Sequence, residues 1–158
     1  MHGIQRTFIY ELVDLGGNFS DNSYGLVHSD FTPKPGYTAI QGLLQLLSDP
    51  GPASNLDTLN FKLSGDLTNV HHLLFEKRNG AFYLALWVEV PGYDLNTKTV
   101  VQVPARQVTV QMAAPVASKV YQFDAAGHIQ TLPVQTGQAR IMPVDDRVSI
   151  IQIGGPFL

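Results

Sequence analysis

The stretch VHHLLFEKRNGAFYLALWVEV, residues 70–90, decides the fold class of this chain. Two apolar runs flank Arg78-Asn79-Gly80, and Asn-Gly between such runs is a strong short-range signal for a β-hairpin. Side chains of a strand alternate between its two faces. In the second run, one face therefore carries Phe82, Leu84, Leu86, Val88 and Val90, and the other carries Tyr83, Ala85, Trp87 and Glu89.

Further short strands are predicted on both sides of this hairpin. They span residues 59–63, 98–103, 107–112, 118–123, 128–131, 137–143 and 148–153. The 14 glycines and 10 prolines favour the many turns that such strands require. Short strands separated by regularly spaced turns predict an antiparallel β-sandwich over residues 53–158.

Composition excludes several classes of protein. Of the 158 residues 44% are hydrophobic and 15% charged, which allows the chain to bury a core. A formal net charge of −3 gives no electrostatic footprint for nucleic acid or an anionic membrane, and no run of about 18 apolar residues could span a bilayer. The absence of cysteine excludes disulfides, thiolate metal sites and cysteine nucleophiles.

The first 52 residues differ from the rest. TFIYELVD (7–14) reads as a strand that is buried on both faces, and a long polar loop follows it. Residues 36–48 then predict a helix, because apolar residues recur every three or four positions. This apolar stripe consists of Tyr37, Ile40, Leu43, Leu44 and Leu47. A strand, loop and helix cannot close a domain alone, so they indicate one βα unit of a parallel α/β fold.

FIYELVD (8–14) and SDNSYGLVHSDFTPKPGYTAIQGLLQLL (20–47) come in the order and spacing of a known family. They resemble the eighth strand, loop and helix of (β/α)8-barrel retaining glycoside hydrolases of the cellulase-like and xylosidase-like kinds. The resemblance implies that residues 1–52 are the incomplete end of a TIM barrel, and that residues 53–158 are its C-terminal β-sandwich. The sandwich half resembles these enzymes only in position, size and its FYLALW strand. The alternative is an ordinary βα loop of another barrel type.

The resemblance also implies where the chemistry lies. Retaining glycosidases use two carboxylates about 5–5.5 Å apart. In the resembled families these glutamates follow the fourth and seventh barrel strands, so both are expected upstream of Met1. The chain is then a fragment that is inactive alone, contains no catalytic residue and needs no cofactor. The parent enzyme is expected to be secreted or periplasmic, although MHGIQRTFIYEL lacks the features of a signal peptide.

Four residues near the expected barrel mouth are candidates for sugar binding. They are Glu11, Asp14, Asn22 and Tyr24, since substrates bind at the C-terminal face of such barrels. The alternative for Glu11 and Asp14 is a structural role in hydrogen bonds at the barrel rim. They are not a catalytic pair, because residues three apart in a strand point to opposite faces. A separate enzyme that uses Glu11 with another carboxylate is a further hypothesis.

Tyr83 and Trp87 form a second candidate surface, on the strand face opposite Leu84 and Leu86. Exposed rings there would stack on the C–H faces of a pyranose, and the chain would act as an autonomous carbohydrate-binding module for a polysaccharide or oligosaccharide. The alternatives are that this face packs on the barrel or on the helix, or belongs to the sandwich core.

Two expectations concern metals and self-association. His71 and His72 are adjacent, so in a strand they face opposite sides, and no metal site is predicted. Truncation of a barrel would uncover the apolar surfaces of residues 7–48. The fragment is therefore expected to fold them onto the sandwich or to self-associate through them.

Overall fold

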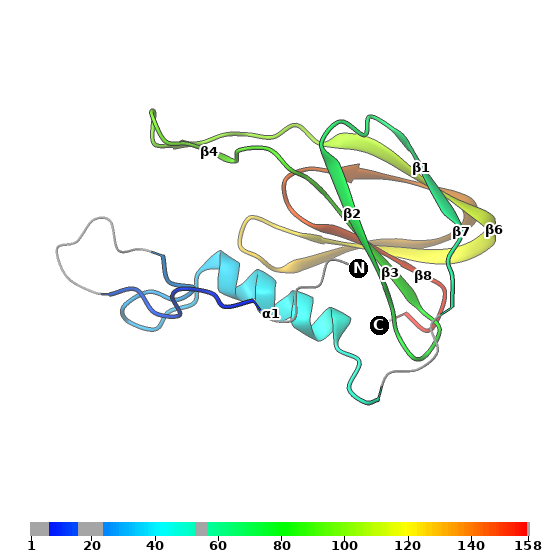
Figure 1. Cartoon of the computed structure of the whole chain (residues 1–158), viewed down its shortest axis with the longest axis horizontal. Helices are drawn as coiled ribbons and strands as arrows, with labels where there is room; N and C mark the ends of the chain where they lie inside the picture. The colour runs from blue at the N-terminus through cyan, green and yellow to red at the C-terminus, as the bar shows by residue number, and fades with distance from the viewer. Residues whose placement is uncertain (1–6, 16–23, 53–56, 158) are drawn as a thin grey trace. The chain divides into compact units, whose positions relative to one another are not determined.

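One helix precedes a series of antiparallel strands, which confirms the predicted mainly-β class (Figure 1). The computed structural model describes residues 7–15, 24–52 and 57–157. Its elements are α1 (Pro35–Leu47), β1 (Phe61–Gly65), β2 (Val70–Glu76), β3 (Phe82–Val88), β4 (Tyr93–Asp94), β5 (Thr99–Val100), β6 (Arg106–Phe123), β7 (Ile129–Val144) and β8 (Ser149–Ile153). Two compact units divide the chain. The first contains α1 as far as Leu46 and the turn Asp124–His128, and the second contains the sheet.

The sheet of the second unit has the strand order β1-β6-β8-β3-β2, and β7 also pairs with β6. The first part of β6 pairs with β1, from Val108 to Met112, and its last part pairs with β8, from Ser118 to Tyr121. Shifts in the β6–β7 register separate these two parts. Bulges of this kind let a strand bend from one layer of a sandwich into the other. The two layers therefore share β6 and β7.

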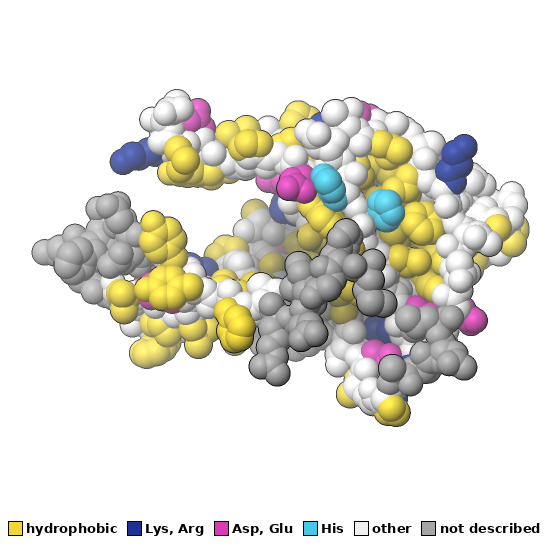
Figure 2. All heavy atoms as spheres, in the orientation of Figure 1, with side chains coloured by type: hydrophobic (Ala, Val, Ile, Leu, Met, Phe, Trp, Pro, Cys, Tyr) yellow, Lys and Arg dark blue, Asp and Glu magenta, His cyan; other side chains and the backbone are white. Residues whose placement is uncertain are grey.

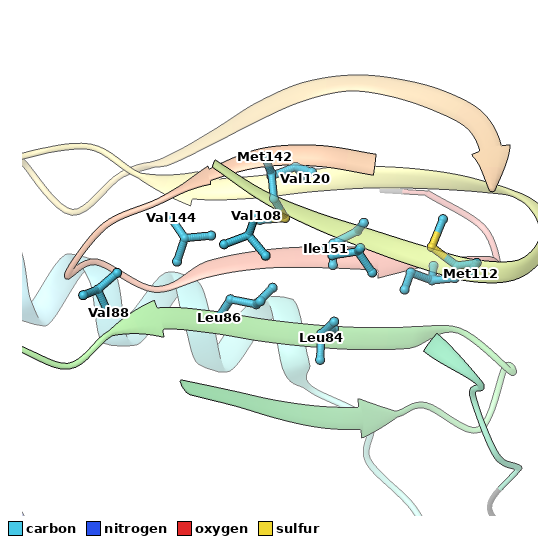
Figure 3. Packing of buried hydrophobic residues seen from close by; sticks show 11 residues of the cluster. Leu84, Leu86, Val88, Val108, Met112, Val120, Met142, Val144 and Ile151 are labelled. Carbon is cyan, nitrogen blue, oxygen red and sulfur yellow. The ribbon is translucent and has the colours of Figure 1, made fainter. Parts of the chain in front are cut away.

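The core lies between these layers (Figure 3). Leu84, Leu86 and Val88 of β3 enter it, as the alternation in the sequence predicts. The other buried members are Val108, Val110, Met112, Val120, Met142, Val144, Ile151 and Ile153. Fully burying an aliphatic side chain of this size contributes about 1.5–3 kcal/mol, so this cluster is the main stabilising feature of the second unit.

The predicted hairpin at Asn79-Gly80 is present, with β2 and β3 in one uninterrupted register. Its turn is fixed locally, because the Asn79 side chain accepts a hydrogen bond from the Ala81 amide at 3.0 Å. Gly80 has a φ of 77°, a conformation that favours glycine. Asp49 accepts hydrogen bonds from the amide and the Nε of Arg78, which ties the segment after α1 to this turn.

Three strand predictions need correction. The separate strands expected at 107–112 and 118–123 are one strand, β6, and those at 128–131 and 137–143 are one strand, β7. The strand expected at 98–103 is reduced to β5, which pairs only with β4. Residues 91–105 leave the larger sheet as an arm, and the two strands of this arm pair with each other (Figure 1). Val103, at the base of the arm, still packs against the core.

The strand expected at 7–14 is also wrong. Within it only Val13 forms a β-bridge, a parallel one with Val27. Phe8 and Tyr10 are 87% and 78% exposed, so the apolar run is not buried on either face. A barrel strand has hydrogen-bonded neighbours on both sides, and the described residues supply one bridge instead of a sheet.

The predicted helix is confirmed within one residue at each end, and Pro35 occupies its first position, where proline is favoured. Its predicted apolar stripe is partly wrong. Leu46 is the buried residue of α1, whereas Leu44 is exposed. None of the described helices is long and apolar enough to cross a membrane.

Candidate functional site

Asp14 is the centre of a polar cluster in the first unit. Its Oδ1 accepts hydrogen bonds from Lys34 Nζ at 2.7 Å and from the Gly25 amide at 2.8 Å. His28 Nδ1 lies 3.7 Å from Oδ2. The hydrogen bond from Lys34 is the main reason why the pKa of Asp14 is lowered, and the Gly25 amide adds to this effect. Asp14 is therefore ionised at neutral pH.

Backbone hydrogen bonds hold the same segment. The amides of Leu26 and Val27 donate to the carbonyls of Glu11 and Leu12, and the Asp14 amide donates to the Val27 carbonyl. Gly25 fits because a Cβ at this position would lie 2.5 Å from the Asp14 amide nitrogen. The glycine thus permits the close approach of the two chain segments.

The other predicted residues of this region do not join the cluster through their side chains. Glu11 is half-buried and takes part through its carbonyl oxygen. The Tyr24 side chain is exposed. Asn22 lies outside the described residues. Of the three described candidates, only Asp14 has a side chain that the structure connects to charged partners.

Tyr83 and Trp87 have different surroundings on the outer face of β3. Tyr83 is buried, and burial raises its pKa, so an exposed platform that includes Tyr83 is wrong. Trp87 is half-buried and stacks on His71, with ring centroids 5.8 Å apart and planes inclined by 23°. His71 Nε2 also lies 3.2 Å from Glu89 Oε2. One tryptophan ring with two polar neighbours remains on this face.

A groove of about 1020 Å³ runs along the arm of residues 91–105, within the second unit. Its apolar lining includes Tyr93, Leu95, Val101 and Val103. Figure 2 shows hydrophobic side chains along this arm, which bears the label β4 in Figure 1. Leu95 is 82% exposed and Tyr93 is 48% exposed, so a ligand in the groove can reach both side chains. We call this feature the arm groove.

The polar lining of the arm groove consists of Asp66, Asp94, Asn96, Gln102, Arg106 and Gln107. Asp66 accepts hydrogen bonds from Arg106 Nη1 at 2.9 Å and from the Thr68 amide at 3.1 Å. Asp94 accepts from the amides of Asn96 and Thr97. The pKa of Asp66 is lowered chiefly by the hydrogen bond from the Thr68 amide. The pKa of Asp94 is lowered chiefly by the hydrogen bond from the Asn96 amide. Both carboxylates are ionised acceptors in fixed positions.

The arm groove is a feature that the sequence alone does not predict. Its local signal was PGYDLNT (91–97), in which an Asp two residues before an Asn predicts a side-chain-stabilised turn. Asp66 and Arg106 are 40 residues apart, and no spacing pattern links them. Their meeting depends on the pairing of β1 with β6.

No family model matches the chain, and no curated protein sequence matches it significantly. Within residues 7–15, 24–52 and 57–157, no group of three or more His, Asp or Glu side chains could hold a metal ion. The structure thus offers two separate candidate sites, the Asp14 cluster of the first unit and the arm groove of the second.

Proposed function

We propose that the chain is the C-terminal part of a retaining (β/α)8-barrel glycoside hydrolase. Residues 1–52 are its last βα unit, and the β-sandwich is a structural accessory to a catalytic barrel encoded upstream. Both catalytic glutamates belong to that upstream part, and the chain alone does not hydrolyse glycosides.

The exposed apolar side chains of residues 8–15 are the observation that supports this proposal best. Phe8, Ile9, Tyr10, Leu12 and Leu15 are all exposed. The backbone of residues 11–14 nevertheless forms hydrogen bonds with residues 26 and 27. Contiguous exposed apolar side chains mark a surface that another chain segment or protein covers. The neighbouring strands of a barrel would cover these side chains.

The Asp14 cluster supports the same proposal. In a (β/α)8 barrel, the loop after a strand forms the C-terminal rim. Asp14 ends the apolar segment, and Lys34 directly precedes α1, so their ion pair joins the two ends of such a loop. The lowered pKa suits a structural carboxylate and does not suit a general acid, which requires a raised pKa.

The coding sequence upstream of Met1 tests the proposal directly. We expect it to continue in frame through seven further βα units, with one Glu after the fourth strand and one after the seventh. A stop codon in frame shortly before Met1 would overturn the proposal.

A second test uses the purified chain with aryl glycosides as substrates. We expect no hydrolysis. Hydrolysis that Glu11→Gln abolishes and Glu76→Gln leaves intact would show a catalytic role for this chain and contradict the proposal. Glu76 is a suitable control because its carboxylate lies in the second unit, where it accepts a hydrogen bond from the Asp57 amide.

The exposed surface also predicts self-association of the isolated chain through residues 7–48. Light scattering should show a mass that rises with concentration, and Phe8→Ser with Tyr10→Ser should reduce the rise. A mass that stays monomeric at all concentrations would contradict self-association.

A further inference from the structure

We propose that the arm groove binds a neutral oligosaccharide. This inference deepens the proposed function and rests on it for the choice of polysaccharides as the source of the ligand. The residues that line the site all belong to the second unit.

The size and lining of the arm groove fit a small polar ligand. Ligand pockets usually have volumes of about 300–1000 Å³, with apolar walls and a few fixed polar groups. The arm groove, at about 1020 Å³, is at the upper end of this range. Its open form suits several linked sugar rings better than a single compact molecule.

The charge of the lining selects against anionic ligands, and one of its two carboxylates is already paired with a cation. Two carboxylates and one guanidinium give the lining a formal charge of −1. A phosphate or polyanion would meet two fixed carboxylates. A cation would meet Arg106, whose Nη1 already donates to Asp66. A ligand without charge avoids both conflicts.

The polar groups match hydroxyl groups in particular. A sugar hydroxyl both donates and accepts hydrogen bonds. The ionised Asp94 carboxylate can accept a hydrogen bond from a sugar hydroxyl. The side-chain amides of Asn96, Gln102 and Gln107 can both donate and accept hydrogen bonds. Because the Asn96 and Thr97 amides hold Asp94 in place, binding costs little side-chain entropy there.

Tyr93 supplies the apolar contact. Its ring is half exposed and lies in the same groove as Leu95 and Val101. The C–H groups on one face of a pyranose can pack against an aromatic ring, while the hydroxyl groups at the ring edge reach the amide and carboxylate side chains. Tyr93 lies opposite Val100 in the pairing of β4 with β5, so its backbone is held in the arm.

The test is a calorimetric titration of the full chain with hexasaccharides of β-1,4-glucan, β-1,4-xylan and β-1,4-mannan. We expect at least one to bind. Tyr93→Ala should weaken binding at least tenfold, and Tyr93→Phe should change it less than threefold, since the ring is retained. Tyr10→Ala is the matched control, because it removes another exposed tyrosine, in the first unit, and should leave affinity unchanged.

Asn96→Ala provides a second variant that removes a polar side chain and leaves the backbone donor to Asp94 in place. It should also weaken binding at least threefold. Binding of none of the three sugars, or binding that Trp87→Ala abolishes and Tyr93→Ala does not, would overturn the arm groove as the site. Neither result bears on the upstream coding sequence, so this inference and the proposed function can fail separately.

Discussion

Lys34 Nζ lies 2.7 Å from Asp14 Oδ1, across 20 residues of sequence. Both side chains are mostly buried, with exposed fractions of 18% for Lys34 and 12% for Asp14. A charged hydrogen bond between shielded groups holds its geometry better than an exposed ion pair does. Asp14 also accepts from the Gly25 amide, so one carboxylate fixes both the backbone at Gly25 and the entry to α1.

Replacement of Asp14 by Asn should loosen this segment. The variant loses the charge that pairs with Lys34 and retains one carbonyl oxygen as an acceptor. Amide hydrogen exchange at Gly25 and Val27 should accelerate at least tenfold. Asp57→Asn, a change at an exposed carboxylate, is the control and should leave these rates unchanged. Equal rates in the Asp14 variant would show that the backbone hydrogen bonds alone hold the segment.

The same cluster should respond to acid. The pKa of Asp14 is lower in the folded chain than the value of about 3.9 expected when the chain is unfolded. The stabilisation that the ionised Asp14 carboxylate contributes is therefore fully present above about pH 3.9. It is lost as the pH falls through the lower pKa of the folded state. Exchange at Gly25 should rise over this acidic range after correction for the intrinsic pH dependence of exchange. The Asp14→Asn variant should lack this additional rise.

Gly65 and Gly80 offer a matched pair for stability measurements. Both have positive φ, 104° for Gly65 and 77° for Gly80. A Cβ at Gly65 would meet the Gln107 carbonyl oxygen at a distance too short for contact, whereas a Cβ at Gly80 would meet nothing within 4 Å. Gly80→Ala should cost about 1 kcal/mol of unfolding free energy from its backbone conformation alone.

Gly65→Ala should cost more than Gly80→Ala by about 1–3 kcal/mol, because the carbonyl of the partner strand β6 must also move. Urea unfolding of both variants measures the difference. Equal costs would show that β1 shifts without strain at the end of its pairing with β6.

Arg140 is the buried cation of β7. The residue is only 3% exposed. Nη2 donates a hydrogen bond to the Pro133 carbonyl at 3.1 Å, whereas Nε and Nη1 have no hydrogen-bond partner among the described residues. Burial lowers its pKa. An unsatisfied buried donor costs about 1–3 kcal/mol. Arg140→Met removes the unsatisfied donors and also the hydrogen bond to Pro133. The net result should be an unfolding free energy that is higher by about 1 kcal/mol.

Arg147→Met is the control for Arg140→Met. Arg147 is paired with Asp145 at the surface, and the change should alter stability by less than about 1 kcal/mol. A large destabilisation by Arg140→Met would contradict the expected gain and would indicate that water or another group satisfies the guanidinium.

The hairpin and its core face could be predicted because their information is local. Asn79-Gly80 sets the turn, and alternation places Leu84, Leu86 and Val88 on one side. The continuity of β6 through Pro115 could not be predicted. The apolar pattern changes there because the β6–β7 register shifts between Gln111 and Val116, and β6 pairs with β7 on both sides of the shift.

The segment 7–14 shows the opposite error. Its aromatic and β-branched residues favour a strand, but strand propensity depends on neighbours, and the described residues offer only the bridge of Val13 to Val27. The arm groove was missed for a related reason. Asp66 and Arg106 come together through long-range pairing of β1 with β6, which single-sequence patterns do not encode.

The shared strands β6 and β7 also bear on how the second unit folds. Sandwiches usually fold slowly, because their layers are joined by contacts between residues far apart in sequence. Here Phe123 and Ile129 are the pair nearest the turn, so the hairpin can zip from a short loop. Because the β6–β7 hairpin bends, its two strands become part of both layers. One local event thus establishes the template on which the remaining strands assemble.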